Sequence, residues 1–140
     1  MKQTRPILLV EDSPMDVELT LRAFERRNPV SPIEVARDGE EALSWIARWE
    51  SGEPQPVVIL LDLNLPRVSG LEVLASLKSH PVLRTIPVVM LTTSAASADV
   101  QAAYERGANS YIVKPVDFDK FIDIAAQIEL YWAVLNEPPS

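Results

Sequence analysis

The stretch Val57-Val58-Ile59-Leu60-Leu61-Asp62 decides the fold class, because an unbroken apolar run leads directly into a carboxylate. A strand with one solvated face would alternate apolar and polar residues. A continuous run rich in Val, Ile and Leu is typical of a strand buried on both faces of a parallel sheet. Three other segments have the same form and end in chemically useful residues: Ile7–Val10 before Glu11-Asp12, Val88–Leu91 before Thr92, and Tyr111–Val113 before Lys114-Pro115.

Helical patterns separate these strands, so the chain is predicted to consist of βα units. Ile33 to Ala36 is a further short strand that suits a sheet edge. Five helices are expected. The first starts at Ser13-Pro14 and reaches about Arg27, the second follows Asp38-Gly39, and the third follows Gly70. The fourth spans about Ala98 to Arg106, and the fifth runs from about Asp117 to Leu135. In the second helix, Ala42, Leu43, Ile46 and Ala47 are expected to face inward. The result is an α/β fold with a five-stranded parallel sheet, doubly wound as (βα)5.

Length and composition favour one domain over residues 1–140, with a core from about 5 to 130, a C-terminal helix to about 135 and a frayed tail at 136–140. The net charge of −7 argues against nucleic-acid binding, which needs a basic face. No apolar run is long enough for a membrane span, and the N-terminus does not resemble a signal peptide. With no cysteine as well, a cytoplasmic location is expected.

The polar residues that follow the strands are expected to converge. In an open parallel sheet the carboxyl ends of the strands lie along one edge, where ligands bind. Glu11, Asp12, Asp62, Thr92 and Lys114 should therefore form one small site. Each has an ordinary alternative: Glu-Asp after a strand is often a solvated turn, and a Thr can simply fill a β-branched strand position. Their joint placement, one set per strand end, favours function.

This set of residues suits phosphoryl chemistry. A carboxylate such as Asp62 can act as a nucleophile toward phosphorus if the charge of the phosphoryl group is neutralised. Mg²⁺ is typically held by one or two carboxylates together with waters and phosphate oxygens, and Glu11 and Asp12 could supply those carboxylates. Lys114 could offset phosphoryl charge, and Thr92 could donate a hydrogen bond to a phosphoryl oxygen.

Four motifs resemble those of response-regulator receiver domains: Val10-Glu11-Asp12, Leu61-Asp62-Leu63-Asn64-Leu65-Pro66, Leu91-Thr92-Thr93-Ser94 and Val113-Lys114-Pro115. The resemblance covers about residues 5–130 and implies a flavodoxin-like sheet of order 2-1-3-4-5. Within the family, the chain is most similar to small single-domain receivers paired with phytochrome-type histidine kinases. That narrower match depends on Ile86-Pro87-Val88-Val89, on the Thr92 motif and on Tyr131-Trp132.

The resemblance implies a role for each matching position. Asp62 would accept the phosphoryl group, and Thr92 and Lys114 would contact it. Asp12 would bind Mg²⁺ (or Mn²⁺) directly and Glu11 through water, with the backbone carbonyl of Asn64 and the side chain of Asp62 completing the protein ligands. The resemblance also implies that the peptide bond between Lys114 and Pro115 is cis and that Tyr111 is the aromatic partner of Thr92 in the switch. It further implies that catalysis is limited to self-phosphorylation and slow self-dephosphorylation.

The expected partners are a histidine kinase, in the narrower version a bacteriophytochrome, and a second copy of the chain. Leu130 to Leu135 is apolar on every side, and a sheet can bury only one stripe of it. Tyr131, Trp132 and Leu135 are therefore expected at a homodimer interface. Two alternatives stay open: a receiver-like scaffold that works without phosphorylation, and a phosphohydrolase of the haloacid-dehalogenase type. The second is disfavoured because Asn64 stands where such enzymes carry an acid.

Overall fold

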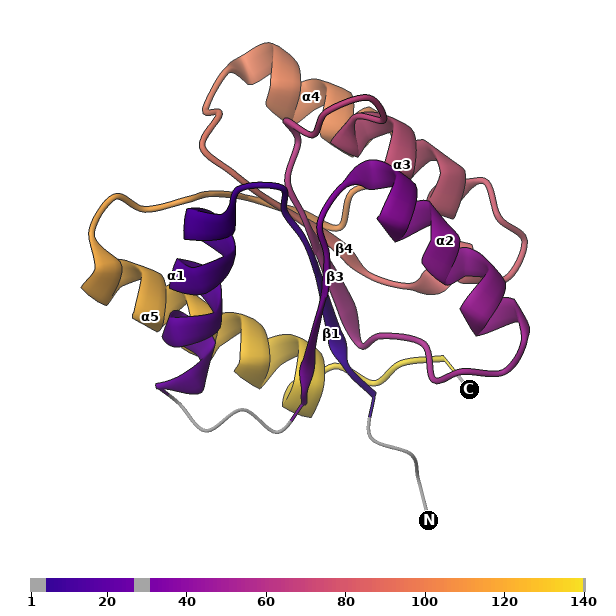
Figure 1. Cartoon of the computed structure of the whole chain (residues 1–140), viewed down its shortest axis with the longest axis horizontal. Helices are drawn as coiled ribbons and strands as arrows, with labels where there is room; N and C mark the ends of the chain where they lie inside the picture. Colours follow the sequence, from indigo (N-terminus) through magenta and orange to yellow (C-terminus); the bar gives the residue numbers. More distant parts are fainter. Residues whose placement is uncertain (1–4, 27–30, 140) are drawn as a thin grey trace.

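The computed structural model describes residues 5–26 and 31–139, and its centre is a five-stranded parallel sheet (Figure 1). The order β2-β1-β3-β4-β5 is the predicted one, and the predicted doubly wound fold is confirmed. The strands are β1 (Ile7–Val10), β2 (Ile33–Ala36), β3 (Val58–Leu61), β4 (Val88–Thr92) and β5 (Ser110–Val113).

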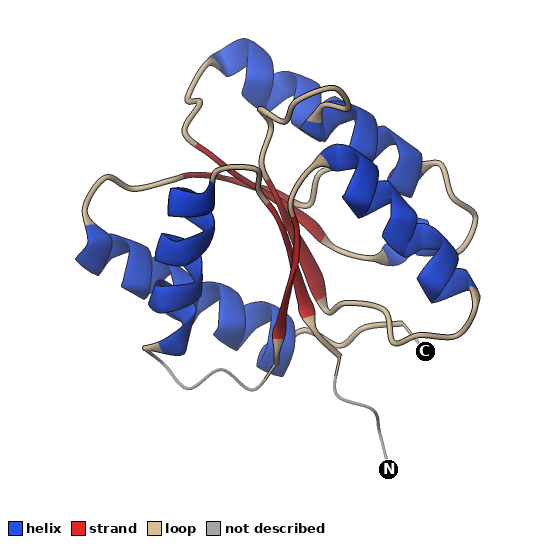
Figure 2. Cartoon of the chain, in the orientation of Figure 1, coloured by secondary structure: helices blue, strands red, loops and turns tan. Residues whose placement is uncertain are grey.

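Helices cover both faces of the sheet (Figure 2). They are α1 (Pro14–Glu25), α2 (Gly39–Glu50), α3 (Gly70–Lys78), the short 3-10 turn η1 (Leu83–Thr85), α4 (Ser97–Glu105), α5 (Phe118–Ile128) and η2 (Glu129–Leu135), which is π-helical. Helices α1 and α5 lie on one face, and α2, α3 and α4 lie on the other (Figure 1). The predicted end of the first helix at Arg27 lies outside the described residues.

Successive residues of the central strands point into different cores, which explains the unbroken apolar runs. In β3, Val58 and Leu60 pack in the cluster beneath α1 and α5, whereas Ile59 and Leu61 pack in the cluster beneath α2 and α3. Residues 58–61 are all at most 1% exposed. Because side chains alternate across a strand, a sheet covered on both faces needs an apolar residue at every position.

Helix α2 corrects one detail of the sequence prediction. Ala42 is buried and Leu43 and Ile46 are partly buried, as expected, but Ala47 is exposed. Trp45 and Trp49 are buried instead, and their rings lie 6.0 Å apart. The physical reason is area: burying two indoles removes far more apolar surface from water than burying one alanine, so the helix rotates to favour the tryptophans.

The C-terminal helix changes character near its end. It is α-helical to Ile128 and π-helical over η2, whereas the sequence predicted one uniform helix to Leu135. Trp132 packs against the apolar cluster of the α1 and α5 face, while Tyr131 and Leu135 stay exposed. Within the described residues, no helix is both long and apolar enough to cross a membrane.

Candidate functional site

The register of the sheet brings the strand ends to one level. Val10 of β1 pairs with Leu61 of β3, so Glu11 and Asp62 each follow a paired residue. The backbone N–H of Asp62 donates to the carbonyl oxygen of Val10 at 3.1 Å. On the other side, the N–H of Lys114 donates to the carbonyl oxygen of Thr92 at 2.7 Å. These main-chain bonds hold the predicted residues at one edge of the sheet.

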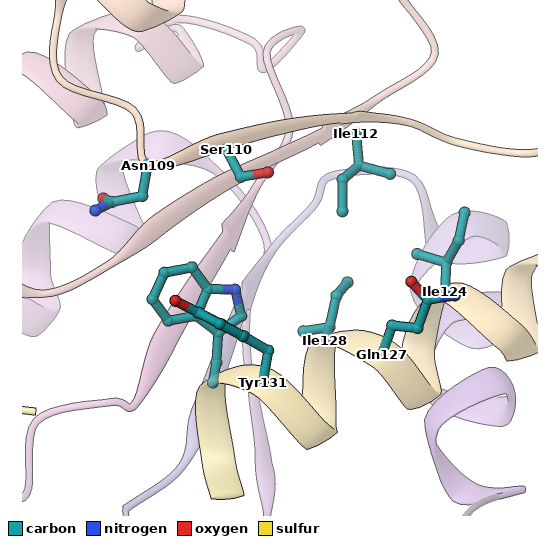
Figure 3. Close-up of a pocket in the computed structure, with 8 residues that line it drawn as sticks. Asn109, Ser110, Ile112, Ile124, Gln127, Ile128 and Tyr131 are labelled. Carbon is teal, nitrogen blue, oxygen red and sulfur yellow. The ribbon is translucent and has the colours of Figure 1, made fainter. Parts of the chain in front are cut away.

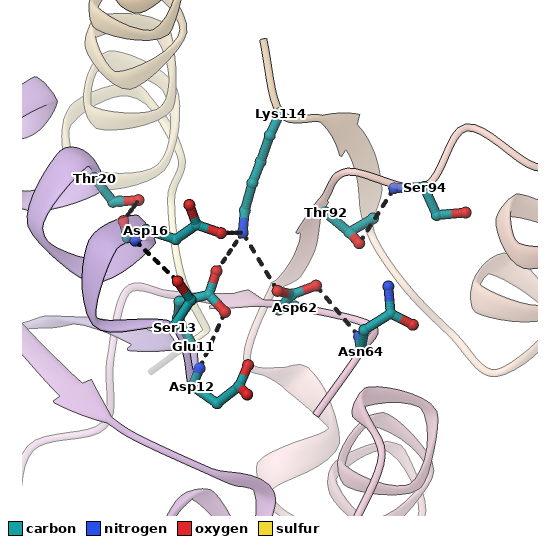
Figure 4. A network of polar contacts seen from close by, with 10 residues as sticks. All are labelled: Glu11, Asp12, Ser13, Asp16, Thr20, Asp62, Asn64, Thr92, Ser94 and Lys114. Carbon is teal, nitrogen blue, oxygen red and sulfur yellow. Dashed lines mark hydrogen bonds and ion pairs between the residues drawn. The ribbon is translucent and has the colours of Figure 1, made fainter. Parts of the chain in front are cut away.

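Lys114 is the centre of the site, because its ammonium contacts three carboxylates (Figure 4). It forms an ion pair with Glu11, lies 3.2 Å from Oδ2 of Asp16 and lies 3.3 Å from Oδ2 of Asp62. The lysine side chain is 7% exposed, so these contacts are only weakly screened by water. Of the three partners, the sequence predicted Glu11 and Asp62 but not Asp16.

Burial and the neighbouring charges set the ionisation of this cluster. Burial raises the pKa of Glu11 to about 8, the hydrogen bond with Asp62 adds to the rise, and Lys114 opposes it. Burial acts in the same sense on Asp62, but Glu11, Lys114, Thr92 and the Asn64 backbone outweigh it and lower the pKa of Asp62. For Lys114, burial is outweighed by Glu11, Asp62 and Asp16, so its pKa is raised. Asp62 is therefore an ionised carboxylate beside an ionised ammonium at neutral pH.

The acidic residues fit a hard divalent cation. One carboxylate oxygen from each of Glu11, Asp12 and Asp62 lies within 4.8 Å of the others. Mg²⁺ and Mn²⁺ favour oxygen ligands of this kind, and three carboxylates this close need positive charge between them. Asp12 is exposed, so the group opens to solvent on that side. The N–H of Asn64 donates to Oδ1 of Asp62 at 3.3 Å, which fixes the carboxylate from the following loop.

Thr92 and Tyr111 both contact Ser94. Thr92 is fully buried, and the N–H of Ser94 approaches its hydroxyl at 3.5 Å. The Tyr111 hydroxyl donates to the carbonyl oxygen of Ser94 at 2.9 Å. The Ser94 hydroxyl in turn donates to Asp99 at 2.5 Å, at the start of α4. The predicted switch pair is therefore joined through one loop residue that the sequence reasoning had not placed between them.

The predicted cis bond between Lys114 and Pro115 is wrong, since the described residues contain only trans peptide bonds. Trans is the intrinsically favoured form of such a bond by about 0.5–1 kcal/mol. The lysine ammonium reaches Glu11, Asp16 and Asp62 from this trans backbone, so the cis form is not needed to direct it into the site.

The expected interface residues lie elsewhere, near the opposite end of β5. Tyr131 and Leu135 are 52% and 63% exposed, whereas Trp132 is half-buried. The Tyr131 and Trp132 rings make an edge-to-face contact with centroids 4.7 Å apart. They border a groove of about 510 Å³ between β5 and α5, into which Ile112 and Ile128 point from opposite sides (Figure 3).

Two residues of the site were missed by sequence reasoning. Asp16 occupies the third position of α1, after the cap Ser13 and Pro14. An acid in the first turn of a helix is normally explained by its favourable interaction with the helix dipole, so the sequence did not indicate a role in the site. Gly70 opens α3, and a Cβ atom there would overlap the main-chain carbonyl of Asp62. Two features of the sequence could have indicated them. Asp16 is close to Asp12 along the chain, and Gly70 directly follows the helix cap Ser69, after the loop that begins at Asp62.

Comparisons with known proteins agree with this geometry. The family model described as response regulator receiver domain matches residues 7–126. The probable methanogenesis regulatory protein FilR2 of Methanothrix harundinacea is 43% identical over 95% of this chain and 86% of its own. Response regulator Rcp1 of Synechocystis is 40% identical over 90% of this chain and 87% of its own, and its Mn²⁺-bound crystal form covers 97% of this chain and 99% of that one with a TM-score of 0.86. The bacteriophytochrome response regulator RtBRR is 50% identical over 98% of this chain and 85% of that chain, with a TM-score of 0.76.

The chain belongs to the response-regulator receiver family. It resembles phytochrome-associated response regulators, and its role is that of a receiver in a phosphorelay. The family is a signalling module and not a conventional enzyme, so a phosphohydrolase of the haloacid-dehalogenase type is excluded. Receivers pair with histidine kinases and bind Mg²⁺ or Mn²⁺ in an acidic pocket.

Proposed function

We propose that Asp62 accepts the phosphoryl group from a phosphohistidine of a histidine kinase. One carboxylate oxygen of Asp62 forms a bond to phosphorus while the phosphorus–nitrogen bond of the donor breaks. The electron pair of the broken bond remains on the imidazole nitrogen. The observation that carries the proposal is the position of the Asp62 carboxylate, which lies 3.3 Å from the Lys114 ammonium and is grouped with the carboxylates of Glu11 and Asp12.

The other site residues then have separate tasks. Asp12 and Asp62 would hold Mg²⁺ or Mn²⁺ directly, Glu11 would hold it through water, and the Asn64 carbonyl would add a neutral oxygen. The cation, when bound, supplies positive charge against the incoming phosphoryl oxygens. Lys114 contributes a second positive charge, and catalysis is limited to the chain's own phosphorylation and slow dephosphorylation. A receiver-like scaffold that needs no phosphorylation is the alternative, and it predicts that none of these residues affects signalling.

Labelling with a small donor tests the acceptor directly. Wild type incubated with Mg²⁺ and phosphoramidate or acetyl phosphate should gain one phosphoryl group, mapped to Asp62 after trapping and proteolysis. Asp62→Asn should stay unlabelled under the same conditions. Asp119→Asn is the matched control, because it removes an exposed acid on α5 outside the site, and it should label like wild type. Full labelling of Asp62→Asn at another residue would refute the assignment.

We also propose that Thr92 and Tyr111 transmit the change to the α4–β5–α5 surface. Thr92 would donate to a phosphoryl oxygen, and Tyr111 would follow because both are connected to Ser94. Tyr111→Phe keeps the ring and removes only the hydroxyl bond to Ser94. It should label normally with the small donor and show smaller phosphorylation-dependent chemical-shift changes in α4 and β5. Equal changes in wild type and Tyr111→Phe would argue against this route.

The kinase partner is proposed to be of the phytochrome type. The support is the 50% identity to RtBRR, a bacteriophytochrome response regulator. A phosphotransfer profile against several purified histidine kinases should show the fastest transfer from a bacteriophytochrome. Faster transfer from a kinase of another sensory class would reject the pairing while leaving Asp62 as acceptor. A cytoplasmic location is proposed with it, in keeping with a chain that lacks cysteine.

A homodimer through η2 and α5 is the proposed assembly. Tyr131 and Leu135 are more than half exposed next to the half-buried Trp132, and a two-fold axis would set equal patches against each other. Each 100 Å² of apolar surface buried contributes about 2.5 kcal/mol before association costs. Sedimentation of wild type and of a Tyr131→Glu, Leu135→Glu variant tests it. A wild type that is monomeric at tens of micromolar, phosphorylated or not, would refute it.

A further inference from the structure

Asp16 carries a carboxylate that contacts the site through Lys114 and that the proposed phosphorylation chemistry leaves unused. Its Oδ2 lies 3.2 Å from Nζ of Lys114, as near as the Asp62 oxygen at 3.3 Å. Lys114 has three N–H donors, and in this arrangement they face three carboxylates. Among the described residues, the candidate cation group is made of Glu11, Asp12 and Asp62, so Asp16 is the one partner of Lys114 outside it.

Two hydroxyl side chains bond to the backbone of Asp16 (Figure 4). Its N–H donates to the hydroxyl of the cap residue Ser13 at 3.3 Å. Its carbonyl oxygen accepts from the hydroxyl of Thr20 at 2.7 Å, and Thr20 is 1% exposed. Both bonds remain if only the Asp16 side chain is changed. The carboxylate therefore projects from a first turn of α1 whose backbone is hydrogen-bonded on both sides of Asp16.

A comparison within the chain shows that the acids of α1 and α3 differ in what they contact, Asp16 being shorter than the Glu or Gln of a capping box. In α3, which has the same Ser-x-x-acid start, Glu72 accepts from the backbone N–H of its cap residue Ser69 at 2.7 Å and completes a capping box. In α1 the Ser13 hydroxyl accepts from the backbone of Asp16, but the Asp16 carboxylate points to Lys114 instead. Asp16 of α1 thus contacts the site through Lys114, whereas Glu72 of α3 only caps the N-terminus of its own helix.

The lysine must exchange partners if Glu11 is to serve a cation. Glu11 is 2% exposed and paired with Lys114, and it cannot at the same time be fully available to a divalent ion. A buried ammonium that loses a partner without replacement is destabilised, because it is removed from water and unpaired. Asp16 is already in contact, and with 35% of its side chain exposed it reaches the site from the solvent side.

We propose that Asp16 is a positioning residue that holds the Lys114 ammonium beside Asp62 and thereby frees Glu11 for the cation. The inference rests on the proposed function, since it concerns the same site. Asp16 does not touch the phosphoryl group and acts through Lys114 alone. Its removal should leave Lys114 more tightly paired with Glu11, so that Mg²⁺ binds less well.

Magnesium binding in a double-mutant cycle tests this coupling. By isothermal titration calorimetry, Asp16→Ala should weaken Mg²⁺ binding about fivefold, a typical coupling for residues in contact. Asp16→Asn keeps an oxygen acceptor and should lose less. In a Lys114→Met background the same Asp16→Ala change should have no effect. Equal weakening of Mg²⁺ binding in both backgrounds would mean that Asp16 acts only as a nearby negative charge. No weakening in either background would mean that Asp16 serves only to start helix α1. Either outcome overturns the proposal.

A second measurement needs no metal. The ¹⁵N signal of the Lys114 ammonium should shift on Asp16→Ala, because one of its N–H groups loses its carboxylate. Glu18→Gln is the control, since it removes an exposed acid of the same helix that pairs with Arg22. An Lys114 signal unchanged by Asp16→Ala refutes the inference. Absence of Mg²⁺ binding by wild type would refute the proposed function itself, whereas equal binding by wild type and Asp16→Ala would refute only the role of Asp16.

Discussion

Replacing Gly70 by alanine should displace the acceptor Asp62 by a steric clash with its main chain. Gly70 begins α3, and its N–H donates to the carbonyl oxygen of Leu63 at 3.0 Å. A Cβ atom at this position would overlap the carbonyl oxygen of Asp62 and would lie 2.8 Å from Cα of Leu63 and 3.0 Å from the carbonyl carbon of Asp62. All of these atoms are main chain, so no side chain can rotate away.

The size of the effect follows from these contacts. Carbon atoms normally approach to about 3.5–4.0 Å, so the segment after β3 must move by roughly 0.5 Å or more. Overpacking of this kind costs about 3 kcal/mol at the upper end of its usual range. Alanine recovers at most about 1 kcal/mol as the better helix former. The net loss in the free energy of unfolding should be about 2 kcal/mol, which lowers the melting temperature by roughly 6 °C.

The assay combines urea unfolding with labelling of Asp62 by phosphoramidate. Gly70→Ala should stay folded at 25 °C but label at least about tenfold more slowly, because the nucleophile is displaced. Gly52→Ala is the matched control: Gly52 has φ +107 and no neighbour within 4 Å, so alanine there costs about 1–2 kcal/mol through backbone strain alone. The control should lose stability and label normally. Loss of less than 0.5 kcal/mol in Gly70→Ala, with normal labelling, would refute the argument.

The remaining predictions concern the cation and the phosphoryl lifetime. Asp12→Ala should abolish Mg²⁺-dependent labelling of Asp62 at ordinary Mg²⁺ levels, and retained labelling would show that the direct ligand is another residue. Glu11→Ala should weaken labelling less, because a water can take the place of the Glu11 carboxylate. The pKa of Glu11 is about 8, so its carboxyl is increasingly protonated below that pH, and only the ionised form can pair with Lys114 or serve a cation. Calorimetric Mg²⁺ affinity should therefore rise from pH 6.5 to 8.5, by at most about tenfold per unit below that pKa, while Asp62, whose pKa is lowered, stays ionised throughout; a flat profile would contradict this. Asn64 and Ser94 carry no carboxylate to orient an attacking water, so the phosphoryl group should persist for minutes or longer after donor removal, and a half-life of seconds would contradict this.

The strands and the convergence of the site were predictable because both depend on short-range patterns. A buried parallel strand must be apolar at every position, and β1, β3 and most of β4 show this directly. The chain topology then forces the strand ends to one edge, so Glu11, Asp62 and Lys114 could be grouped before any coordinates. The strand order came from the family resemblance, since periodicity alone does not specify which strands are neighbours.

Helix faces and helix ends were less predictable. Ala47 and Trp49 are both apolar, so the periodicity treats them alike, whereas in the structure the residue with the larger apolar area is buried. The last helix becomes π-helical over the segment in which Trp132 packs against the apolar cluster, a change that no periodicity in the sequence indicated. The form of the Lys114–Pro115 bond depends on the whole path of the loop after β5, and the resemblance predicted it wrongly.

By itself, the sequence determined the class of fold, the edge of the sheet that carries the site and the acid, hydroxyl and ammonium groups found there. These follow from local pattern and chain order. Only the tertiary structure decided that Asp16 shares Lys114 with Glu11 and Asp62, and that a side chain at position 70 would overlap the acceptor's carbonyl. Both facts depend on atoms within 4 Å of each other in segments that the fold brings together, and no periodicity in the sequence specifies which atoms those are.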